Sequence, residues 1–344
     1  MFGPEITQAF ARVKRAFDPD GIMNPGKIVD PPRMDENLRF GGEYATSHIE
    51  THFRFEREES FQQGVELCSG VGHCRKKLVG TMCPSYMATL DEQHSARGRA
   101  NALRRALSST TPSDLSSPEL HRAMDLCLAC KACKAECPSN VDMAKFKYEF
   151  LAHYAARHGY SLRARLFAHI RGLSRLASKA APIVNPVVGN RLNRWLLDRL
   201  LNIDRRRSLP RFAHTPFSCW FKRRSYARRG SRGKVLLFAD TFVEYNEPQI
   251  GIAATITLER AGFHVELAPQ KVCCGRPLLS HGFLDEAKDR AMKNLDLLAP
   301  YAEEGFSIVG LEPSCLSTFT DDYLDLLVDD RARKIAERFC LLEE

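Results

Sequence analysis

Residues 127–138 read CLACKACKAECP, with cysteines at positions 127, 130, 133 and 137 and a proline at position 138. At this C-x2-C-x2-C-x3-C-P spacing, three closely spaced thiolates bind one iron-sulfur cluster, and the fourth cysteine binds a different cluster. A structural zinc site uses two separated cysteine pairs and needs neither the third cysteine nor the proline. The stretch therefore predicts iron-sulfur clusters in preference to zinc.

A second cluster requires a second cysteine motif, and residues 68–84 supply one in altered form. Cys68 and Cys74 have the spacing of the first and third cysteines of the C-x2-C-x2-C motif, but Val71 occupies the position of the second cysteine. The pair Cys83-Pro84 follows Cys74 after eight residues instead of three. Because the cysteine before proline binds the other cluster, one complete 4Fe-4S cluster is expected to bind through its iron atoms to Cys83, Cys127, Cys130 and Cys133.

The second cluster is then left with Cys68, Cys74 and Cys137. Three thiolates and an apolar residue at the fourth corner predict a 3Fe-4S cluster, or a 4Fe-4S cluster with a ligand that is not cysteine. His73 is the nearest candidate for such a ligand, although a histidine beside a ligand is more often a supporting residue.

A third group consists of Cys273-Cys274-Gly275 and, 41 residues after Cys274, Cys315. Both cysteine-containing loops are expected to follow strands, where open α/β sheets place their sites. This group is a candidate for a further site, and a reduced, packed loop is the alternative. Cys219 and Cys340 have no partner by spacing and are expected to be packing residues.

The composition excludes several classes of protein. The chain has 344 residues, 44% of them hydrophobic, and twelve cysteines. Such a chain is not disordered throughout, and its longest charge-free stretch, residues 78–90, is too short for a membrane span of about 20 residues. No secretory signal is visible. A cytoplasmic location is expected, where cysteines serve metal binding or redox chemistry instead of disulfides.

The net charge of +8 is unevenly distributed. Residues 161–234 contain 19 Lys/Arg and two acids, Asp198 and Asp204, so the rest of the chain is net acidic. Apolar residues recur at helical spacing in 162–176 and 192–201. This stretch predicts a basic amphipathic connector, and the alternative is contact with an acidic partner domain or peripheral contact with the inner face of a membrane. No nucleic-acid-binding signature accompanies the charge, so no nucleic acid is expected.

Hydrophobic patterns predict the remaining elements. A short amphipathic helix with Ile6, Phe10, Val13 and Phe17 on one face ends before Pro19. A second helix is expected at 95–107, followed by a loop at 108–118. Strands at 235–239, 264–268 and 306–310 alternate with helices at 247–261, 284–301 and 314–327. That alternation predicts a small α/β unit with a mainly parallel sheet.

Several of these stretches resemble known families. The sequence FDPDGIMNPGK at 17–27 looks like the C-terminal end of FAD-linked oxidases of the D-lactate dehydrogenase and vanillyl-alcohol-oxidase type. The stretches GTMCPSYMAT (80–89), SARGRANALR (95–104) and CLACKACKAECPSNVDMAKFKYEF (127–150) resemble bacterial proteins that fuse a flavin oxidase to a glycolate-oxidase iron-sulfur-subunit-like module. Residues 235–327 are similar to one CCG domain, as in that subunit and in heterodisulfide reductases. They read Phe238-Ala239-Asp240-Thr241 where that family has its first cysteine.

The resemblance implies an α+β chain of five segments. These are a C-terminal remnant of an FAD-linked oxidase domain at 1–32, a linker at 33–60, a mostly helical two-cluster ferredoxin-like domain at 61–160, the basic connector at 161–234 and a CCG-type domain at 235–344. It also implies a flavin-binding body upstream of Met1 and a second CCG copy beyond Glu344. The chain is thus expected to be an incomplete fragment.

The resemblance further implies an FAD-linked oxidoreductase that oxidises a D-2-hydroxy acid such as lactate, glycolate or 2-hydroxyglutarate. Flavin releases electrons in pairs and each cluster accepts one, so two clusters would carry electrons toward a quinone or another acceptor. FAD is expected on the oxidase domain, fused or separate, and no catalytic residue is assigned. Two alternatives are a heterodisulfide or thiol reductase that uses Cys273, Cys274 and Cys315, and a zinc-stabilised interaction module.

Overall fold

The computed structural model describes residues 2–38, 41–108, 115–224, 230–269 and 273–344. The chain divides into two compact units, Met1–Thr46 and Ser47–Glu344. The predicted loop at 108–118 falls largely on residues outside the described ranges, and so do residues 225–229 of the basic stretch.

The first unit contains one helix, α1 (Pro4–Phe17), within its described residues. Proline occupies the start of the helix, where its missing N–H costs nothing. Asp18 ends the helix and accepts hydrogen bonds from the backbone N–H groups of Ile22 and Met23 at 2.9 and 3.0 Å. The helix confirms the expected pattern, and its apolar face is exposed at Phe10 and Phe17.

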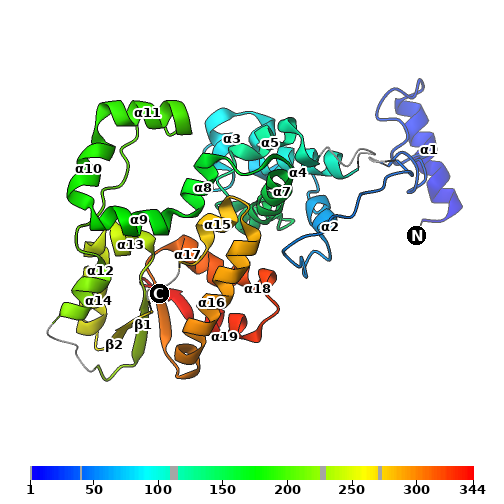
Figure 1. The fold of residues 1–344 in the computed structure, drawn as a ribbon. Coiled ribbons are helices and arrows are strands. Elements are labelled where there is room, and N and C mark those ends of the chain that lie inside the picture. Colours follow the sequence, from blue (N-terminus) through cyan, green and yellow to red (C-terminus); the bar gives the residue numbers. More distant parts are fainter. Residues whose placement is uncertain (1, 39–40, 109–114, 225–229, 270–272) are drawn as a thin grey trace. The chain divides into compact units, whose positions relative to one another are not determined.

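The second unit begins with a cysteine-rich helical region (Figure 1). Its helices are short because loops that carry cysteine interrupt them. They are α2 (Phe61–Glu66), η1 (His73–Arg75), α3 (Pro84–Thr89), η2 (Glu92–His94), α4 (Ala96–Leu107), α5 (Pro118–Asp125), α6 (Ala132–Glu136) and α7 (Met143–His158).

Aromatic side chains form the core of this region. Phe55 stacks on Phe146 with ring centroids 6.0 Å apart, and Phe61 meets both rings edge-on. The buried carboxylate of Glu149 accepts the backbone N–H groups of His52 and Phe53 at 2.8 and 2.7 Å. Part of the segment predicted as a linker therefore packs into the core, which its polar composition did not indicate.

Five helices follow and form the basic connector: α8 (Leu162–Ala168), α9 (Ile170–Lys179), α10 (Ala181–Gly189), α11 (Arg191–Leu201) and α12 (Phe217–Arg223). Ser161 and Asn190 cap α8 and α11 by accepting backbone N–H groups of the first turn. The helical spacing predicted at 162–176 and 192–201 is confirmed by α8, α9 and α11, although His169 divides the first stretch into two helices, and α10 and α12 were not predicted. No helix among the described residues is both long and apolar enough to cross a membrane.

The last region contains a four-stranded parallel sheet in the order β2-β1-β3-β4. Its strands are β1 (Lys234–Phe238), β2 (His264–Leu267), β3 (Ser307–Gly310) and β4 (Phe339–Leu341). Its helices are α13 (Thr241–Tyr245), α14 (Pro248–Arg260), α15 (Arg276–Ser280), α16 (Leu284–Glu303), α17 (Pro313–Ser317), the π-helical turn η4 (Thr318–Asp322), α18 (Tyr323–Leu326) and α19 (Asp330–Arg338).

Helices cover both faces of the sheet (Figure 1). Val235 and Leu237 of β1 pack with Phe217 of α12 on one face, whereas Leu236 and Phe238 belong to the large core on the other face. Strands buried on both faces explain the continuous hydrophobic runs in the sequence. The expected parallel sheet is confirmed, but the helix expected at 314–327 is three short helical pieces, and the edge strand β4 was not predicted.

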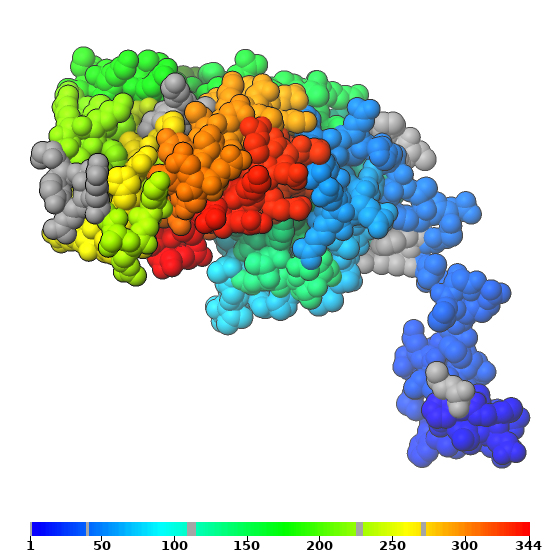
Figure 2. All heavy atoms as spheres, turned by 90° about the horizontal axis from the view of Figure 1, so that it is seen from below, coloured from blue at the N-terminus to red at the C-terminus, as the bar shows by residue number. Residues whose placement is uncertain are grey.

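The sheet region lies directly against the cysteine-rich region (Figure 2). The backbone N–H of Arg54 donates to the carbonyl of Asp325 at 3.0 Å. The buried ammonium of Lys145 donates to Asp325 at 2.6 Å and to Glu58 at 3.1 Å. These contacts join segments about 180 and 270 residues apart in the sequence and keep the cysteine loops beside the sheet.

Candidate metal centres

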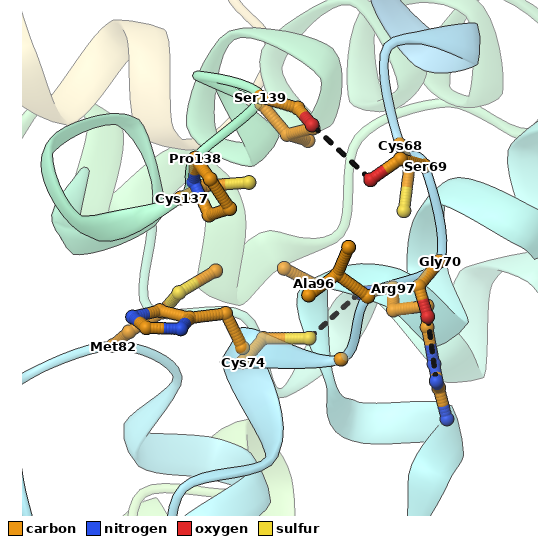
Figure 3. Close-up of a pocket in the computed structure, with 14 residues that line it drawn as sticks. Cys68, Ser69, Gly70, Cys74, Met82, Ala96, Arg97, Cys137, Pro138 and Ser139 are labelled. Atoms are coloured by element: carbon orange, nitrogen blue, oxygen red, sulfur yellow. Dashed lines mark hydrogen bonds between the residues drawn. The ribbon is translucent and has the colours of Figure 1, made fainter.

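Three of the predicted cysteines surround one cavity. Cys68 follows α2, Cys74 lies in η1, and Cys137 ends α6. Figure 3 shows their sulfur atoms turned toward a common space, although they come from three separate segments. Val71 and His73 line the same cavity. The structure thus brings together the set expected for the second cluster, including the histidine alternative.

Four other cysteines surround a second cavity. Its wall contains Cys83 at the start of α3, Cys127 and Cys130 from the loop before α6, and Cys133 in the first turn of α6. These are the four residues expected at the complete 4Fe-4S site. The structure thus assembles both predicted sets by proximity, while their role as ligands stays a prediction.

The two cavities are neighbours of similar size. Each has a volume of about 20 Å³, and Ala96, the first residue of α4, lines both. The first turn of α4 therefore separates the two cavities. Its backbone N–H groups give this helix end a partial positive charge, which favours negatively charged groups on either side.

Hydrogen-bond donors point at the sulfur atoms. The backbone N–H of Arg97 lies 3.3 Å from the sulfur of Cys74, and that of Ala129 lies 3.4 Å from Cys127. The buried guanidinium of Arg99 lies 3.7 Å from the sulfur of Cys83. Donors of this kind stabilise thiolates and tune cluster potentials, so the residues present fit iron-sulfur clusters.

Burial makes three of the cysteines, Cys68, Cys83 and Cys133, poor acids when they are free. It raises the pKa of Cys68 and of Cys83, and it raises the pKa of Cys133 most strongly. A buried thiol of this kind is a weak nucleophile. Coordination by a metal removes the proton outright, so the environment suits metal ligands better than reactive thiols.

The loop that presents Cys127, Cys130 and Cys133 is held in an unusual conformation. Ala129 and Lys131 have left-handed backbones, with φ of 51° and 61°. The ammonium of Lys147 on α7 donates to the carbonyl of Cys127 at 2.5 Å and fixes the loop. Strain stored in non-glycine residues is typical of functional loops.

The ligand spacing fits a cluster with several corners. Within the described ranges, no three His, Cys, Asp or Glu side chains are arranged as the ligands of one metal ion. The thiols of the first two groups line cavities and do not meet at one point. A cluster presents a separate iron atom to each cysteine, which matches thiols distributed around a cavity.

The third cysteine group assembles at the carboxyl edge of the sheet. Cys274 and Cys315, which follow β2 and β3, have sulfur atoms 3.2 Å apart, and Cys273 lies beside them. The hydroxyl of Tyr323 donates to the carbonyl of Cys274 at 2.7 Å, and this contact anchors the loop. The contact with Cys274 and burial raise the pKa of Cys273 well above its usual value.

The segment that lacks the family's first cysteine lies next to this group. Asp240 caps α13 by accepting the backbone N–H groups of Phe242 and Val243 at 2.7 and 3.2 Å. The hydroxyl of Thr241 lies 3.8 Å from the sulfur of Cys273. On this side of the group, the thiol of Cys273 therefore has a hydroxyl for a neighbour.

Charged residues join the second cavity to the third cysteine group. Arg276, two residues after Cys274, donates to the carbonyl of Ala129 and lies 3.9 Å from Asp322. Lys131 donates to Asp322 at 2.6 Å. The spacing of the cysteines did not reveal these residues, because the contacts of Ala129 with Arg276 and of Lys131 with Asp322 each cross more than 140 positions.

The remaining cysteines stay apart from the three groups. Cys219 lies in α12, and Cys340 lies in β4 and packs against the smaller core. Arg97 and Arg99 are the functional candidates that spacing missed. The signal was present in the stretch SARGRANALR, where both arginines follow the helix cap Ser95.

Family models match three parts of the chain. Residues 1–28 match the C-terminal domain of FAD-linked oxidases, residues 64–141 match a 4Fe-4S dicluster domain, and residues 238–320 match a cysteine-rich domain named CCG. The dicluster match contains the first two groups of cysteines, and the cysteine-rich match contains the third.

Three curated proteins show sequence similarity to this chain. The chain is 27% identical over 365 residues to D-2-hydroxyglutarate dehydrogenase of Pseudomonas putida, a match that covers 93% of this chain and 36% of the relative. The match to D-2-hydroxyglutarate dehydrogenase of Escherichia coli is 25% over 378 residues and covers 96% and 37%. A subunit of the anaerobic glycerol-3-phosphate dehydrogenase of Escherichia coli is 31% identical over 173 residues, covering 50% and 44%.

The chain spans less than half the length of these relatives. No solved structure is significantly similar to it. The matches nevertheless agree with the resemblance seen in the sequence at all three places. In this order, segments of the chain match the end of an FAD-linked oxidase C-terminal domain, a 4Fe-4S dicluster domain and a CCG domain, so the chain is similar to FAD-linked oxidases that carry an iron-sulfur and CCG module.

Proposed function

We propose that residues 47–344 are the electron-transfer part of an FAD-linked dehydrogenase. The observation that carries this proposal is the pair of adjacent cavities, each lined by one predicted set of cysteines and both bounded by Ala96. Clusters in these cavities would accept electrons one at a time, which allows the two-electron chemistry of a flavin to feed a one-electron path.

The ligands follow the predicted division. Cys83, Cys127, Cys130 and Cys133 would hold a 4Fe-4S cluster, and Cys68, Cys74 and Cys137 would hold the second cluster. The nuclearity of the second cluster depends on whether His73 supplies a fourth ligand. Val71, which is 72% exposed, carries no donor atom and leaves that corner to another group.

The contacts around Arg276 support an order for the path. The loop of Cys127 and Cys130 touches the loop of Cys274 through the hydrogen bond from Arg276 to Ala129. The cavity of Cys68, Cys74 and Cys137 shares its wall with the second cavity at Ala96. Electrons would therefore pass from one cavity to the other before they reach the third cysteine group.

The flavin and its substrate belong to the whole protein. The matched relatives are D-2-hydroxyglutarate dehydrogenases and a subunit of an anaerobic glycerol-3-phosphate dehydrogenase. We infer that the substrate is a D-2-hydroxy acid, that FAD binds to an oxidase domain fused to this chain or associated with it, and that the final acceptor is a quinone or another carrier.

The connector helices would hold the module at a membrane. Leu176, Ile183, Leu192 and Leu200 of α9, α10 and α11 are between 61% and 76% exposed. Residues 161–234, which include these helices, carry 19 Lys/Arg against two acids. Exposed apolar side chains beside basic ones complement an anionic lipid surface, where a quinone would be within reach.

Anaerobic reconstitution of the full chain with iron and sulfide tests the cluster assignment. About seven bound irons are expected if the second cluster is 3Fe-4S, and about eight if both are cubanes. Cys130→Ser should abolish the reducible 4Fe-4S signal in electron paramagnetic resonance and spare the other signal. Cys219→Ser, a change outside all three groups, is the matched control and should alter neither.

Two results would contradict the proposal. Zinc bound without acid-labile sulfide would favour the zinc-stabilised module instead. Retention of both signals in Cys130→Ser would mean that the ligands are wrongly assigned.

A thiol reductase is the second candidate, because the sulfur atoms of Cys274 and Cys315 lie 3.2 Å apart. Its weakness is the raised pKa of Cys273 and Cys274, which leaves little thiolate at neutral pH. Mass spectrometry of the reconstituted protein after oxidation and reduction separates the two. A reversible Cys274–Cys315 disulfide with no effect on either cluster signal would favour the reductase.

A further inference from the structure

A third cavity, distinct from the two that the first cysteine sets line, has Cys273 in its wall. Its volume is about 390 Å³, in the range of sites that hold small molecules. Its lining comes from α8, α9, α13, α15 and α16 and from the loop that carries Cys273. The cavity therefore lies where the basic connector meets the sheet region.

Arginine residues make the lining of this cavity positively charged. Arg171 and Arg175 come from α9 and Arg290 from α16, and the described lining contains no carboxylate. The guanidinium of Arg171 lies over the ring of Tyr245, 5.5 Å from its centroid. Glu244, whose buried carboxylate interacts with Arg171, already accepts the backbone N–H of Ser218 at 3.1 Å.

The rest of the cavity wall is apolar or uncharged. Ala168, Pro277 and Leu278 supply apolar surface, and the thiol of Cys273 belongs to the same wall. The side chain of Arg290 runs past Gly275, where its Cγ would lie 3.7 Å from an added β-carbon. A bound molecule would thus meet guanidinium groups as well as apolar groups and a thiol.

We propose that this cavity binds a small organic anion that carries a carboxylate or a phosphate group. Guanidinium groups bind both anions through paired hydrogen bonds, and several of them in a concave, partly apolar site favour a small anion over a metal ion or an extended polymer. The bound anion would lie against the third cysteine group. The proposal concerns binding alone and does not depend on the clusters.

Isothermal titration calorimetry of the full chain with succinate, inorganic phosphate and neutral succinamide tests this site. At least one anion should bind with saturable heat, and succinamide should not bind, because it has the size of succinate without its charge. Binding of succinate alone would assign a carboxylate, binding of phosphate alone would assign a phosphate group, and binding of both would assign anions in general.

Substitutions then connect the binding to the cavity. The double variant Arg171→Gln/Arg290→Gln should weaken anion binding by about tenfold or more, because it removes two of the paired donors. Lys179→Gln removes one exposed positive charge from the same helix α9 and should leave the affinity unchanged. Arg290→Lys keeps the positive charge but loses the paired donors. A smaller loss of anion affinity is expected than in the double variant. This single change tests the site if the double variant does not fold.

Three outcomes would overturn the proposal. The first is that neither anion binds to the unaltered chain. The second is that succinamide binds as tightly as succinate. The third is that Lys179→Gln weakens binding as much as the change of Arg290 does, because general surface charge would then explain the result.

Discussion

At the scale of single residues, Arg99 is a charged side chain that is buried in the core. Its side chain is 1% exposed, and its described hydrogen bonds go to the carbonyl of Ala123 at 2.8 Å and the hydroxyl of Ser85 at 2.9 Å. Its third contact is the sulfur of Cys83. A buried positive charge needs a negative partner, and the thiolate of a bound cluster would supply one.

We expect Arg99→Gln to lower the midpoint potential of the cluster at Cys83. The positive charge favours the reduced, more negative state, so its removal should shift the potential downward by on the order of 60 mV, a tenfold change for a one-electron couple. A redox titration followed by electron paramagnetic resonance measures the shift. Arg105→Gln, on the exposed face of the same helix, is the control and should change the potential little.

An unchanged potential in Arg99→Gln at full iron content would show that this guanidinium does not act on the cluster. Loss of the cluster altogether would instead assign the residue to the assembly of the site. The 4Fe-4S signal of the Arg105→Gln control distinguishes that result from a general loss of helix stability.

At the scale of elements, α9, α10 and α11 differ from the other helices of the second unit. Ile183 and Leu200 are 71% and 76% exposed, and α11 has no buried residue. A helix that packs poorly on its own protein gains stability when its apolar face meets another surface. An anionic surface would complement the basic residues of the same segment.

Vesicle co-sedimentation tests the connector. The full chain should bind vesicles that contain anionic lipid, and the double variant Leu192→Gln/Leu200→Gln should bind at least about tenfold more weakly, because each leucine loses the transfer energy of its side chain. Val328→Gln, a change of an 84% exposed residue outside the connector, is the matched control.

Salt should also weaken vesicle binding, since screening shortens the reach of the basic residues. Binding that is independent of salt and equal in the leucine variant and the control would mean that the connector does not contact lipid.

At the scale of the whole molecule, one titratable group reports on the packing of the second unit. His281 ends α15 and stacks on Phe167 of α8 with ring centroids 6.1 Å apart. Burial, together with the positive charges of Lys147 and Arg163, lowers the pKa of His281 to about 4. The folded protein therefore resists protonation of a group that the unfolded chain protonates near pH 6.5.

The contribution of His281 to stability should be complete above pH 6.5 and should be lost as the pH falls toward 4. Between about pH 7 and pH 4.5 the unaltered protein should lose unfolding free energy as His281 becomes protonated. Over the same range, the His281→Gln variant should lose about 1 to 2 kcal/mol less, because it lacks this group. Urea unfolding of both proteins across this range measures the difference. Parallel pH curves for the two proteins would contradict the assignment.

The sequence by itself determined the local parts of this protein. Cysteine spacing predicted which thiols share a cavity, because spacing along the chain restricts which thiols can reach a common centre. Periodic apolar residues predicted α1, α8, α9 and α11, and hydrophobic runs predicted the first three strands, because both patterns depend on neighbours a few positions away.

Only the tertiary structure decided how these parts meet. The contact of Arg276 with Ala129, the burial of Phe53 and Phe55 in a segment that reads as polar, and the cavity formed by α9, α13, α15 and α16 beside Cys273 all join distant segments. No local pattern encodes such contacts, because they arise from the packing of whole surfaces and from buried charges that find partners far along the chain. The sequence thus specified the expected ligand set of each centre, and the packing of the sheet region against the cysteine loops decided which centres adjoin.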